Sequence, residues 1–153
     1  MARLEDIPEP TRTAVRDVPC PSFDETPFVL GPPLSQRRVA IVSSAALIRR
    51  GDKPFPVGSG EHRAVPNAWP TTDILVSHVS INFDRAGFQR DINVVHPVDR
   101  LTELAAEGLI GSVAPTHFSV MGSTDPAAMV ESADAIAQAL HADGVDAVLL
   151  CPV

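Results

Sequence analysis

The chain has 153 residues, of which 44% are hydrophobic and 20% are charged, so it can form one ordinary globular domain and little more. Its formal net charge is −7 at pH 7, and no run of Lys or Arg exceeds two residues. Binding to nucleic acid or to an anionic membrane surface needs clustered positive charge, so we expect neither kind of partner.

The amino-terminal residues show no signal-peptide pattern, and the longest apolar run is too short to span a bilayer, so a cytoplasmic protein is expected. Cys20 and Cys151 lie at opposite ends of the chain without a CxxC motif or a ligand-like spacing. This pattern indicates neither a disulfide framework nor a metal site, and it fits a reducing compartment.

Prolines dominate the start of the chain, where seven of the 15 fall within the first 33 residues. Proline disrupts sheet ladders and helix interiors, so residues 1–36 are expected to form an extended Pro-rich arm with one short helix, or to be partly disordered. Residues 37–153 are then expected to form the folded α/β part.

Two strands are predicted in the first half of this part. Arg38–Ser43 is a β-branched apolar run typical of a buried strand, and the turn-rich residues 51–62 follow it as a loop. Asp73–Ser80 is the second predicted strand, with His78 near its carboxyl end. Residues 81–97 are polar and rich in turn formers, and they are assigned to a loop by exclusion.

Helices and strands alternate in the second half. Helical spacing predicts helices over Pro97–Glu107 and Asp125–Asp143, with a short strand ending at Gly122 between them. Val145–Leu150 follows as a buried strand. Strands separated by helices indicate a mostly parallel sheet with flanking helices, here an incomplete three-layer α/β domain.

Three side chains are expected near the carboxyl ends of these strands, where open α/β sheets bind ligands. Cys151 is either a buried apolar thiol or a reactive thiol at this edge. His78 and His117 follow apolar runs, and each is either a structural histidine or a general acid or base.

The polar loop before the Pro97 helix contains Asp91 and Asn93. Such a loop can bind a small zwitterion or carboxylate, or it can merely cap the helix that follows. The chain contains no GxGxxG, GxxxxGK[ST], HExxH or GxSxG motif, so nucleotide-binding, zincin and α/β-hydrolase assignments have no support.

A family resemblance covers the chain from about Leu34 to Val153. The motifs NVVHPVDRL, EGLIG and HFSVMG occur in that order before the DGVDAVLL strand. In this order they resemble the selenoprotein B family of glycine, sarcosine, betaine and D-proline reductases. The resemblance implies that residues 37–153 are the amino-terminal part of an α/β reductase domain.

In that family, the strand corresponding to VDAVLL is followed by three residues and then by selenocysteine. Here the three residues are Cys151, Pro152 and Val153. The resemblance therefore implies a selenocysteine immediately after Val153, in a chain truncated because its UGA codon is read as a stop. The chain departs from the family in its shorter amino-terminal arm and in having Cys151 before this position.

The resemblance also implies a function: an oxidoreductase subunit that reductively cleaves a C–N bond in a small amino-acid-like substrate, using a dithiol/disulfide electron donor. It implies partner reductase subunits, a thiol redox donor and an oligomeric assembly, with the truncated chain inactive by itself. Cys151 is then a candidate resolving thiol, and His78 and His117 are candidate proton donors. Asp91 and Asn93 are candidate substrate contacts.

The alternative comes from another class of protein. A chain that truly ends at Val153 would be a small α/β protein that binds a ligand or a partner without catalysis. The codon after Val153 and the reading frame beyond it separate the two hypotheses.

Overall fold

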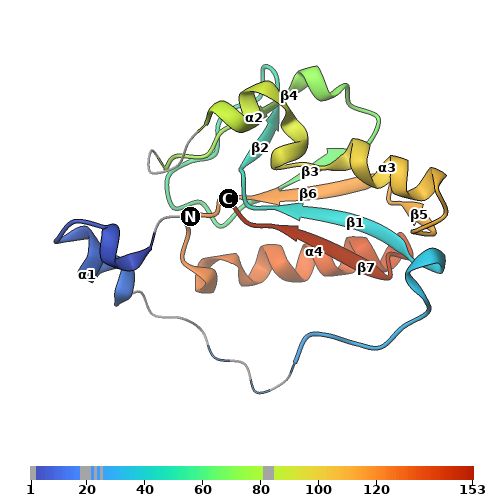
Figure 1. The fold of residues 1–153 in the computed structure, drawn as a ribbon, viewed down its shortest axis with the longest axis horizontal. Helices are drawn as coiled ribbons and strands as arrows, with labels where there is room; N and C mark the ends of the chain where they lie inside the picture. The colour runs from blue at the N-terminus through green and yellow to red at the C-terminus, as the bar shows by residue number, and fades with distance from the viewer. Residues whose placement is uncertain (1–2, 18–21, 23, 25, 81–84) are drawn as a thin grey trace. The chain divides into compact units, whose positions relative to one another are not determined.

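A computed structural model describes residues 3–17, 22, 24, 26–80 and 85–153 of the chain (Figure 1). The chain divides into two compact units, residues 1–30 and 31–153. The first unit contains the 3₁₀ turn η1 (Leu4–Asp6) and the short helix α1 (Thr11–Arg16). Part of the predicted extended arm lies outside the described residues, so the arm stays a prediction. Cys20 lies wholly outside them.

The second unit is built around one sheet, which contains five strands among the described residues. After the 3₁₀ turn η2 (Leu34–Gln36), the chain enters the central strand β1 (Arg38–Ser43). On one side, β1 pairs in parallel with β5 (Ser112–Val113) at its start and with β6 (Thr116–Val120) at its end. On the other side it pairs in parallel with β7 (Ala147–Cys151).

Helices cover the two faces of this sheet, as Figure 1 shows: α3 (Val98–Ala106) lies on one face and α4 (Val130–Ala142) on the other. Because successive strand residues point to opposite faces, β1 contributes to both cores. The α3 side buries Val39, Ile41, Val98, Leu101 and Ile110. The α4 side buries Ala40, Ala114, Phe118, Ile136 and Leu140. The predicted fold class, a mostly parallel α/β sheet with flanking helices, is confirmed.

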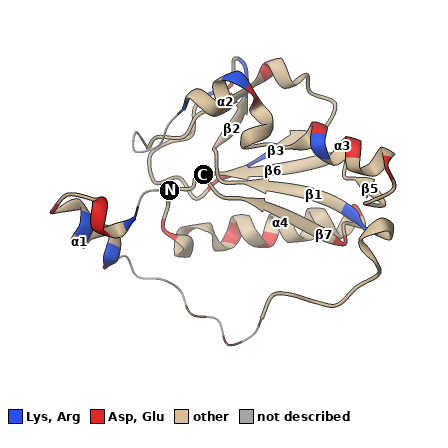
Figure 2. Cartoon of the chain, in the orientation of Figure 1, with Lys and Arg blue, Asp and Glu red and all other residues tan. Residues whose placement is uncertain are grey.

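The two predicted helices are present with nearly the expected bounds. Pro97 directly precedes α3, and Asp125 caps the 3₁₀ turn η5 (Pro126–Met129) that leads into α4. The Asp125 carboxylate accepts a hydrogen bond from the backbone N–H of Ala127 at 2.9 Å. Charged side chains gather mainly on helices and loops, whereas most of the main sheet is uncharged (Figure 2).

The region between β1 and α3 differs from the prediction. A strand over Asp73–Ser80 is wrong in extent, because the 3₁₀ turn η3 (Thr71–Asp73) leads into a three-residue strand, β4 (Ile74–Val76). β4 pairs antiparallel with β2 (Leu47–Arg49) in a separate small sheet. His78 therefore does not follow a strand of the main parallel sheet.

The described part of the predicted loop at residues 81–97 contains the short helix α2 (Ala86–Arg90) and the 3₁₀ turn η4 (Ile92–Val94). Both are too short to produce a periodic apolar pattern, and packing of Phe88 and Ile92 against an apolar cluster holds them in place. The antiparallel strand β3 (His62–Pro66), which pairs with β6, was also not predicted.

Strand β7 lies beside β1 and forms its ladder with β1 alone among the described residues. Its apolar side chains remain accessible: 42% of Val148, 38% of Leu149 and 70% of Leu150 is exposed. No helix in the described ranges is long and apolar enough to cross a membrane.

Candidate functional site

Strands β1, β6 and β7 end close together, and Ser44 joins their ends. The backbone N–H of Ser44 donates to the carbonyl of Cys151 at 3.0 Å, and the Ser44 carbonyl accepts from the N–H of Gly122 at 3.0 Å. The Ser44 hydroxyl oxygen accepts from the N–H of Val153 at 2.8 Å. One residue thus fixes the chain that follows β6 and the chain that follows β7.

Gly122 allows the backbones to approach closely at this edge. A Cβ atom at this position would lie 3.0 Å from the Cβ, carbonyl oxygen and hydroxyl oxygen of Ser44. A residue with a Cβ would therefore be tight against Ser44, and Ser44 or the end of β6 would have to shift by a few tenths of an ångström to fit it.

The turn after Ser44 is held in an unusual conformation. Ala46 is fully buried and has a φ of 54°, in the left-handed region that residues with a Cβ rarely adopt. Ser119 supports this turn, because its hydroxyl donates to the carbonyl of Ser43 at 2.8 Å and accepts from the N–H of Leu47 at 2.9 Å. The edge of the sheet where β1, β6 and β7 end is therefore densely hydrogen-bonded.

Cys151 is the last residue of β7, at the edge where the sequence placed it. Its side chain packs against the apolar cluster on the α3 side, and this burial raises the pKa of the thiol. A raised pKa keeps the thiol protonated at neutral pH, so its described surroundings do not activate it. A redox role for Cys151 stays a prediction.

His117 lies in the sheet interior rather than at the carboxyl edge. It is the second residue of β6, it is fully buried, and its Nδ1 accepts a hydrogen bond from the backbone N–H of Ile41 at 3.0 Å. The neutral ring must therefore carry its proton on Nε2. Burial lowers the pKa of His117 to about 4, so the imidazole is uncharged at pH 7.

His96 packs against His117, and this pair was not predicted. The two rings meet edge to face with centroids 5.3 Å apart, and His96 is 1% exposed. Burial, followed by the neighbouring His117, lowers the pKa of His96 to about 4, while Asp99 opposes the shift. Within the described residues, His96 Nδ1 and His117 Nε2 have no hydrogen-bond partner.

His78 is also buried, beyond the end of β4. Its Nδ1 accepts from the N–H of Ser80 at 3.1 Å, and burial together with the nearby Arg85 lowers its pKa. No hydrogen bond or ring contact within the described residues joins any two of His78, His117 and Cys151. The catalytic grouping of these three residues stays a prediction.

Asp91 and Asn93 form a local network at the start of α3. Asp91 Oδ1 accepts from both the backbone N–H and the side-chain Nδ2 of Asn93 at 2.9 Å. Asn93 also bonds Asp99, donating from Nδ2 to the carboxylate and accepting the Asp99 N–H at its Oδ1. The hydrogen bonds from Asn93 lower the pKa of Asp91. Both residues therefore serve as local caps.

Asp91 and Asn93 also line a cavity of about 580 Å³ that lies between β4 and the α2–η4 segment. Arg50, Arg85 and Arg90 contribute cationic groups to the same cavity. Arg50 and Arg90 come from separate parts of the chain, so sequence reasoning did not bring them together.

A second polar cluster, between β3 and α4, does not form a nucleophilic pair. The Ser132 hydroxyl donates to the carbonyl of Gly60 at 2.6 Å and lies 3.1 Å from His62 Nδ1. Because its proton already points to Gly60, the hydroxyl accepts from the His62 N–H. A histidine that activates a serine must instead accept the serine proton. This arrangement is structural.

The described fold and edge geometry define a mostly parallel three-layer α/β protein with strand ends held together at Ser44. The glycine/sarcosine/betaine reductase selenoprotein B family matches residues 71–153, more than half of the chain. The chain belongs to this family.

Curated relatives agree with this assignment. The chain is 34% identical over 120 residues to the D-proline reductase subunit gamma of Acetoanaerobium sticklandii, which covers 76% of this chain and 49% of that protein. It is 29% identical over 140 residues to the glycine reductase complex component B subunit gamma of Carboxydothermus hydrogenoformans, covering 88% of this chain and 32% of the relative. The same figures hold for the Peptoclostridium acidaminophilum protein of that name.

The chain thus spans about half or a third of the length of these relatives. No solved structure matches it.

Proposed function

We propose that the chain is the amino-terminal part of a selenoprotein B-type reductase subunit, acting in the reductive cleavage of a C–N bond of a small amino-acid-like substrate. The observation that carries this proposal is the family match, which runs through β7 to Val153. The names of the relatives, a D-proline reductase subunit and glycine reductase complex components, support the reaction class.

The proposed reaction consumes two electrons. The C–N bond breaks, the carbon gains hydrogen, the nitrogen leaves as an amine, and a dithiol donor becomes a disulfide. We place the reactive selenocysteine immediately after Val153, where its low pKa would make it a strong nucleophile at neutral pH. The hydrogen bond from Val153 N–H to Ser44 supports this position, because it orients the backbone at this point.

Cys151 is proposed as the resolving thiol, three positions before the reactive residue. Its position at the end of β7 supports this role, whereas its raised pKa does not favour attack as a free thiolate. His78 and His117 are the proposed proton donors. Each ring accepts a hydrogen bond at Nδ1, which leaves Nε2 as the nitrogen that would carry a transferred proton, whereas the lowered pKa of both rings disfavours the imidazolium that a proton donor needs.

Partner reductase subunits and a separate thiol donor belong to the same proposal, as do a cytoplasmic location and an oligomeric assembly. The relatives' names, which describe subunits of reductases, support the partner subunits. The 153-residue chain without its reactive residue is expected to be inactive.

The nucleotide sequence after Val153 provides the first test. A UGA codon followed by an open frame with cysteine residues is expected, and a selenium-containing product of greater mass should form under selenocysteine-inserting expression. A UAA or UAG codon, or a closed frame, would contradict the reductase proposal and favour a non-catalytic binding protein.

In the extended product, Cys151→Ser should slow turnover with the dithiol donor, whereas Cys20→Ser provides the matched control. Unchanged turnover in Cys151→Ser would exclude the resolving role.

A further inference from the structure

Strand β7 and the flank of α4 on its side expose five apolar residues: Val148 and Leu150 on the strand, and Val130, Ala133 and Ala137 on the helix. We propose that the segment following Val153 in the longer subunit covers this β7–α4 surface. Its first helix packs on β7 beside α4, and a further parallel strand then pairs with β7 on the side away from β1. The inference rests on the proposed function, which supplies that segment.

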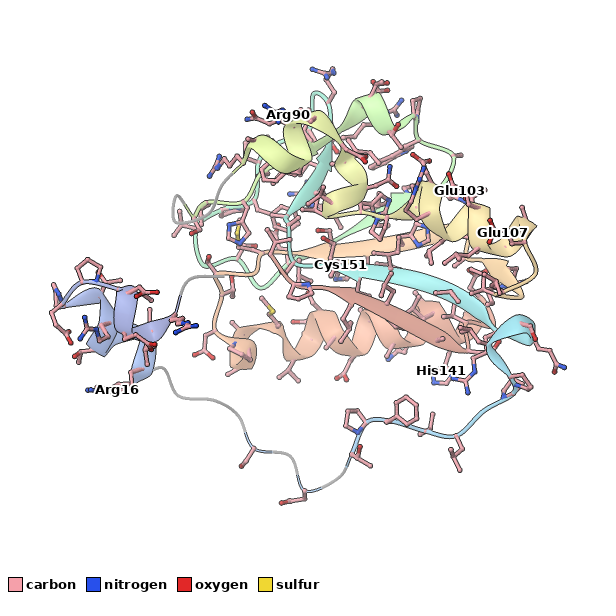
Figure 3. The ribbon with its side chains drawn as sticks, viewed as in Figure 1. Arg16, Arg90, Glu103, Glu107, His141 and Cys151 are labelled. Carbon is pink, nitrogen blue, oxygen red and sulfur yellow. The ribbon has the colours of Figure 1, made fainter. Side chains whose placement is uncertain are left out.

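The exposed side chains of β7 point to the α4 side of the sheet. Val148 pairs with Ala40 and Leu150 pairs with Val42, and both β1 residues belong to the core on the α4 side. Because paired residues of neighbouring strands point to the same face, Val148 and Leu150 face that side as well. Cys151, labelled in Figure 3, has the opposite orientation and packs in the core on the α3 side.

The flank of α4 on the β7 side is apolar and uncovered. Ala135 lines a cavity with β3, and Ala139 lines one with β6, so these two residues mark the flank on the side away from β7. Successive helix residues are about 100° apart, which places Val130, Ala133 and Ala137 on the opposite flank. All three are exposed. Two alanines here allow a neighbouring helix to approach closely, because interaxial distance depends on side-chain size.

Chain topology independently predicts a helix on this surface. The connection through α3 runs from β1 to the β5–β6 side and lies on one face of the sheet. The connection through α4 runs from β6 back past β1 to β7 and lies on the other face. Opposite directions on opposite faces have the same hand, and parallel crossovers in one sheet share a hand almost always. A connection from β7 to a strand beyond it therefore places its helix on the α4 face.

The proposed occupant is long enough for this connection. The matched region makes up 49% of the D-proline reductase subunit and 32% of a glycine reductase component, so each relative contains at least as much chain again. A parallel crossover needs only about a dozen residues or more. One helix and one strand after Val153 therefore fit within the length of a subunit of this family.

This route also explains the location of the proposed reactive position. The chain leaves β1 toward the α3 face, and it would leave β7 toward the α4 face, so a topological switch point lies between the ends of these two neighbouring strands. Open α/β sheets bind their ligands in the crevice at such a point. The hydrogen bond from the Val153 N–H to Ser44 lies at this crevice.

Photo-crosslinking of the full-length subunit, with its selenocysteine replaced by cysteine, tests the proposal. Benzoylphenylalanine placed at Leu150 or at Ala137 should form links within the chain to one shared segment beyond Val153, identified by mass spectrometry of the digest. The same probe at Ala139, on the opposite flank of α4, is the matched control and should not reach that segment.

Hydrogen exchange of the full-length subunit provides a second readout. Leu150→Asp places a charge under the proposed helix and should speed exchange of the β7 amides at least about tenfold. Leu109→Asp, at an exposed leucine away from this surface, should leave their exchange unchanged. Far-UV circular dichroism checks that both variants fold.

Links from Leu150 to a second copy or to a partner subunit would overturn the proposal, as would the absence of links beyond Val153. Links to the first helix after Val153 from Leu149, on the α3 side, but not from Leu150 would show a crossover of the opposite hand and would also overturn it. These failures leave the reductase proposal intact. A closed frame after Val153 would instead remove both proposals.

Discussion

Strands β1 and β7 are parallel neighbours that differ sharply in burial. Their residues pair in register from Val39–Ala147 to Ser43–Cys151, and both strands are largely apolar. Ala40 and Ile41 in β1 are completely buried, whereas 70% of Leu150 in β7 is exposed. The same kind of sequence is therefore interior in one strand and surface in the next.

The difference shows that neighbouring elements, rather than apolar character, determine how much a strand stabilises this fold. β1 has strands on both sides and a helix over each face, so four of its six residues are buried. β7 has apolar residues on both faces, a pattern typical of fully covered parallel strands, but the described residues cover it only in part. β1 should therefore dominate stability.

The largest effect is expected from acid, which should lower the free energy of unfolding through the two buried histidines on the β1 side of this comparison. The pKa values of His96 and His117 are lowered from 6.5 to about 4, so the unfolded chain binds more protons between these values. The free energy of unfolding should therefore be highest above about pH 6.5. It should fall by about 3 kcal/mol for each imidazole as the pH drops toward 4. Urea unfolding measured from pH 7.5 to 4 checks this.

The acid effect should shrink in His117→Gln, which removes one titrating ring, and persist in His141→Gln, which changes an exposed histidine on α4. Stability that does not change between pH 7.5 and 4.5 would contradict the assignment of these two rings as buried and neutral.

Truncation of a matched pair of side chains compares the two strands directly. Ile41→Ala should lower the free energy of unfolding by about 3 kcal/mol, because it leaves a cavity in the core on the α3 side. Leu150→Ala should cost less than about 1 kcal/mol, because most of that side chain already contacts water. Chemical denaturation measures both, and equal losses would show that β7 is covered in solution.

Removal of a buried hydroxyl at the end of β1 should have a smaller effect. Ser43 donates to the carbonyl of Val95 at 2.7 Å, and it is completely buried. Ser43→Ala leaves that carbonyl without its partner, and it should lower the free energy of unfolding by about 1–3 kcal/mol. Ser112→Ala in β5 is a control that should change it by less than about 0.5 kcal/mol. Equal losses in the two variants would argue against a specific role for the Ser43 bond.

The smallest effect on stability is expected at the open edge. Leu150→Lys should leave the melting temperature nearly unchanged but reduce self-association, because a charge on an edge strand opposes pairing with another chain. Leu109→Lys, at another exposed leucine, should not have this effect. Sedimentation velocity measures the self-association of each variant. A wild-type chain that is monomeric at high concentration would show that the β7 edge does not self-associate.

Sequence reasoning succeeded where a pattern is long or continuous. β1 has the predicted bounds, and α3 and the η5–α4 segment follow the predicted helices closely, because apolar spacing and capping residues such as Asp125 are local signals. Short elements were not predicted correctly, because β4 depends on β2 for its hydrogen bonds and α2 depends on tertiary packing.

The candidate site was predictable only in part, for the same reason. Cys151 lies at the end of β7, as expected from an unbroken apolar run. His117 was misplaced, because β6 begins one residue before it rather than ending near it. The His96–His117 contact and the convergence of Arg50 with Arg90 depend on chain folding between distant residues, which no local pattern encodes.

The hydrogen bond from the Ile41 N–H to His117 Nδ1 limits which residues can replace this histidine. A side chain at this position must present an acceptor one bond beyond Cγ, and the Oδ1 of asparagine meets that requirement, whereas leucine offers no acceptor. Homologous sequences should therefore exchange histidine for asparagine here more readily than for an apolar residue of similar volume. A single acceptor atom thereby links the amino-acid choice in β6 to the backbone of β1.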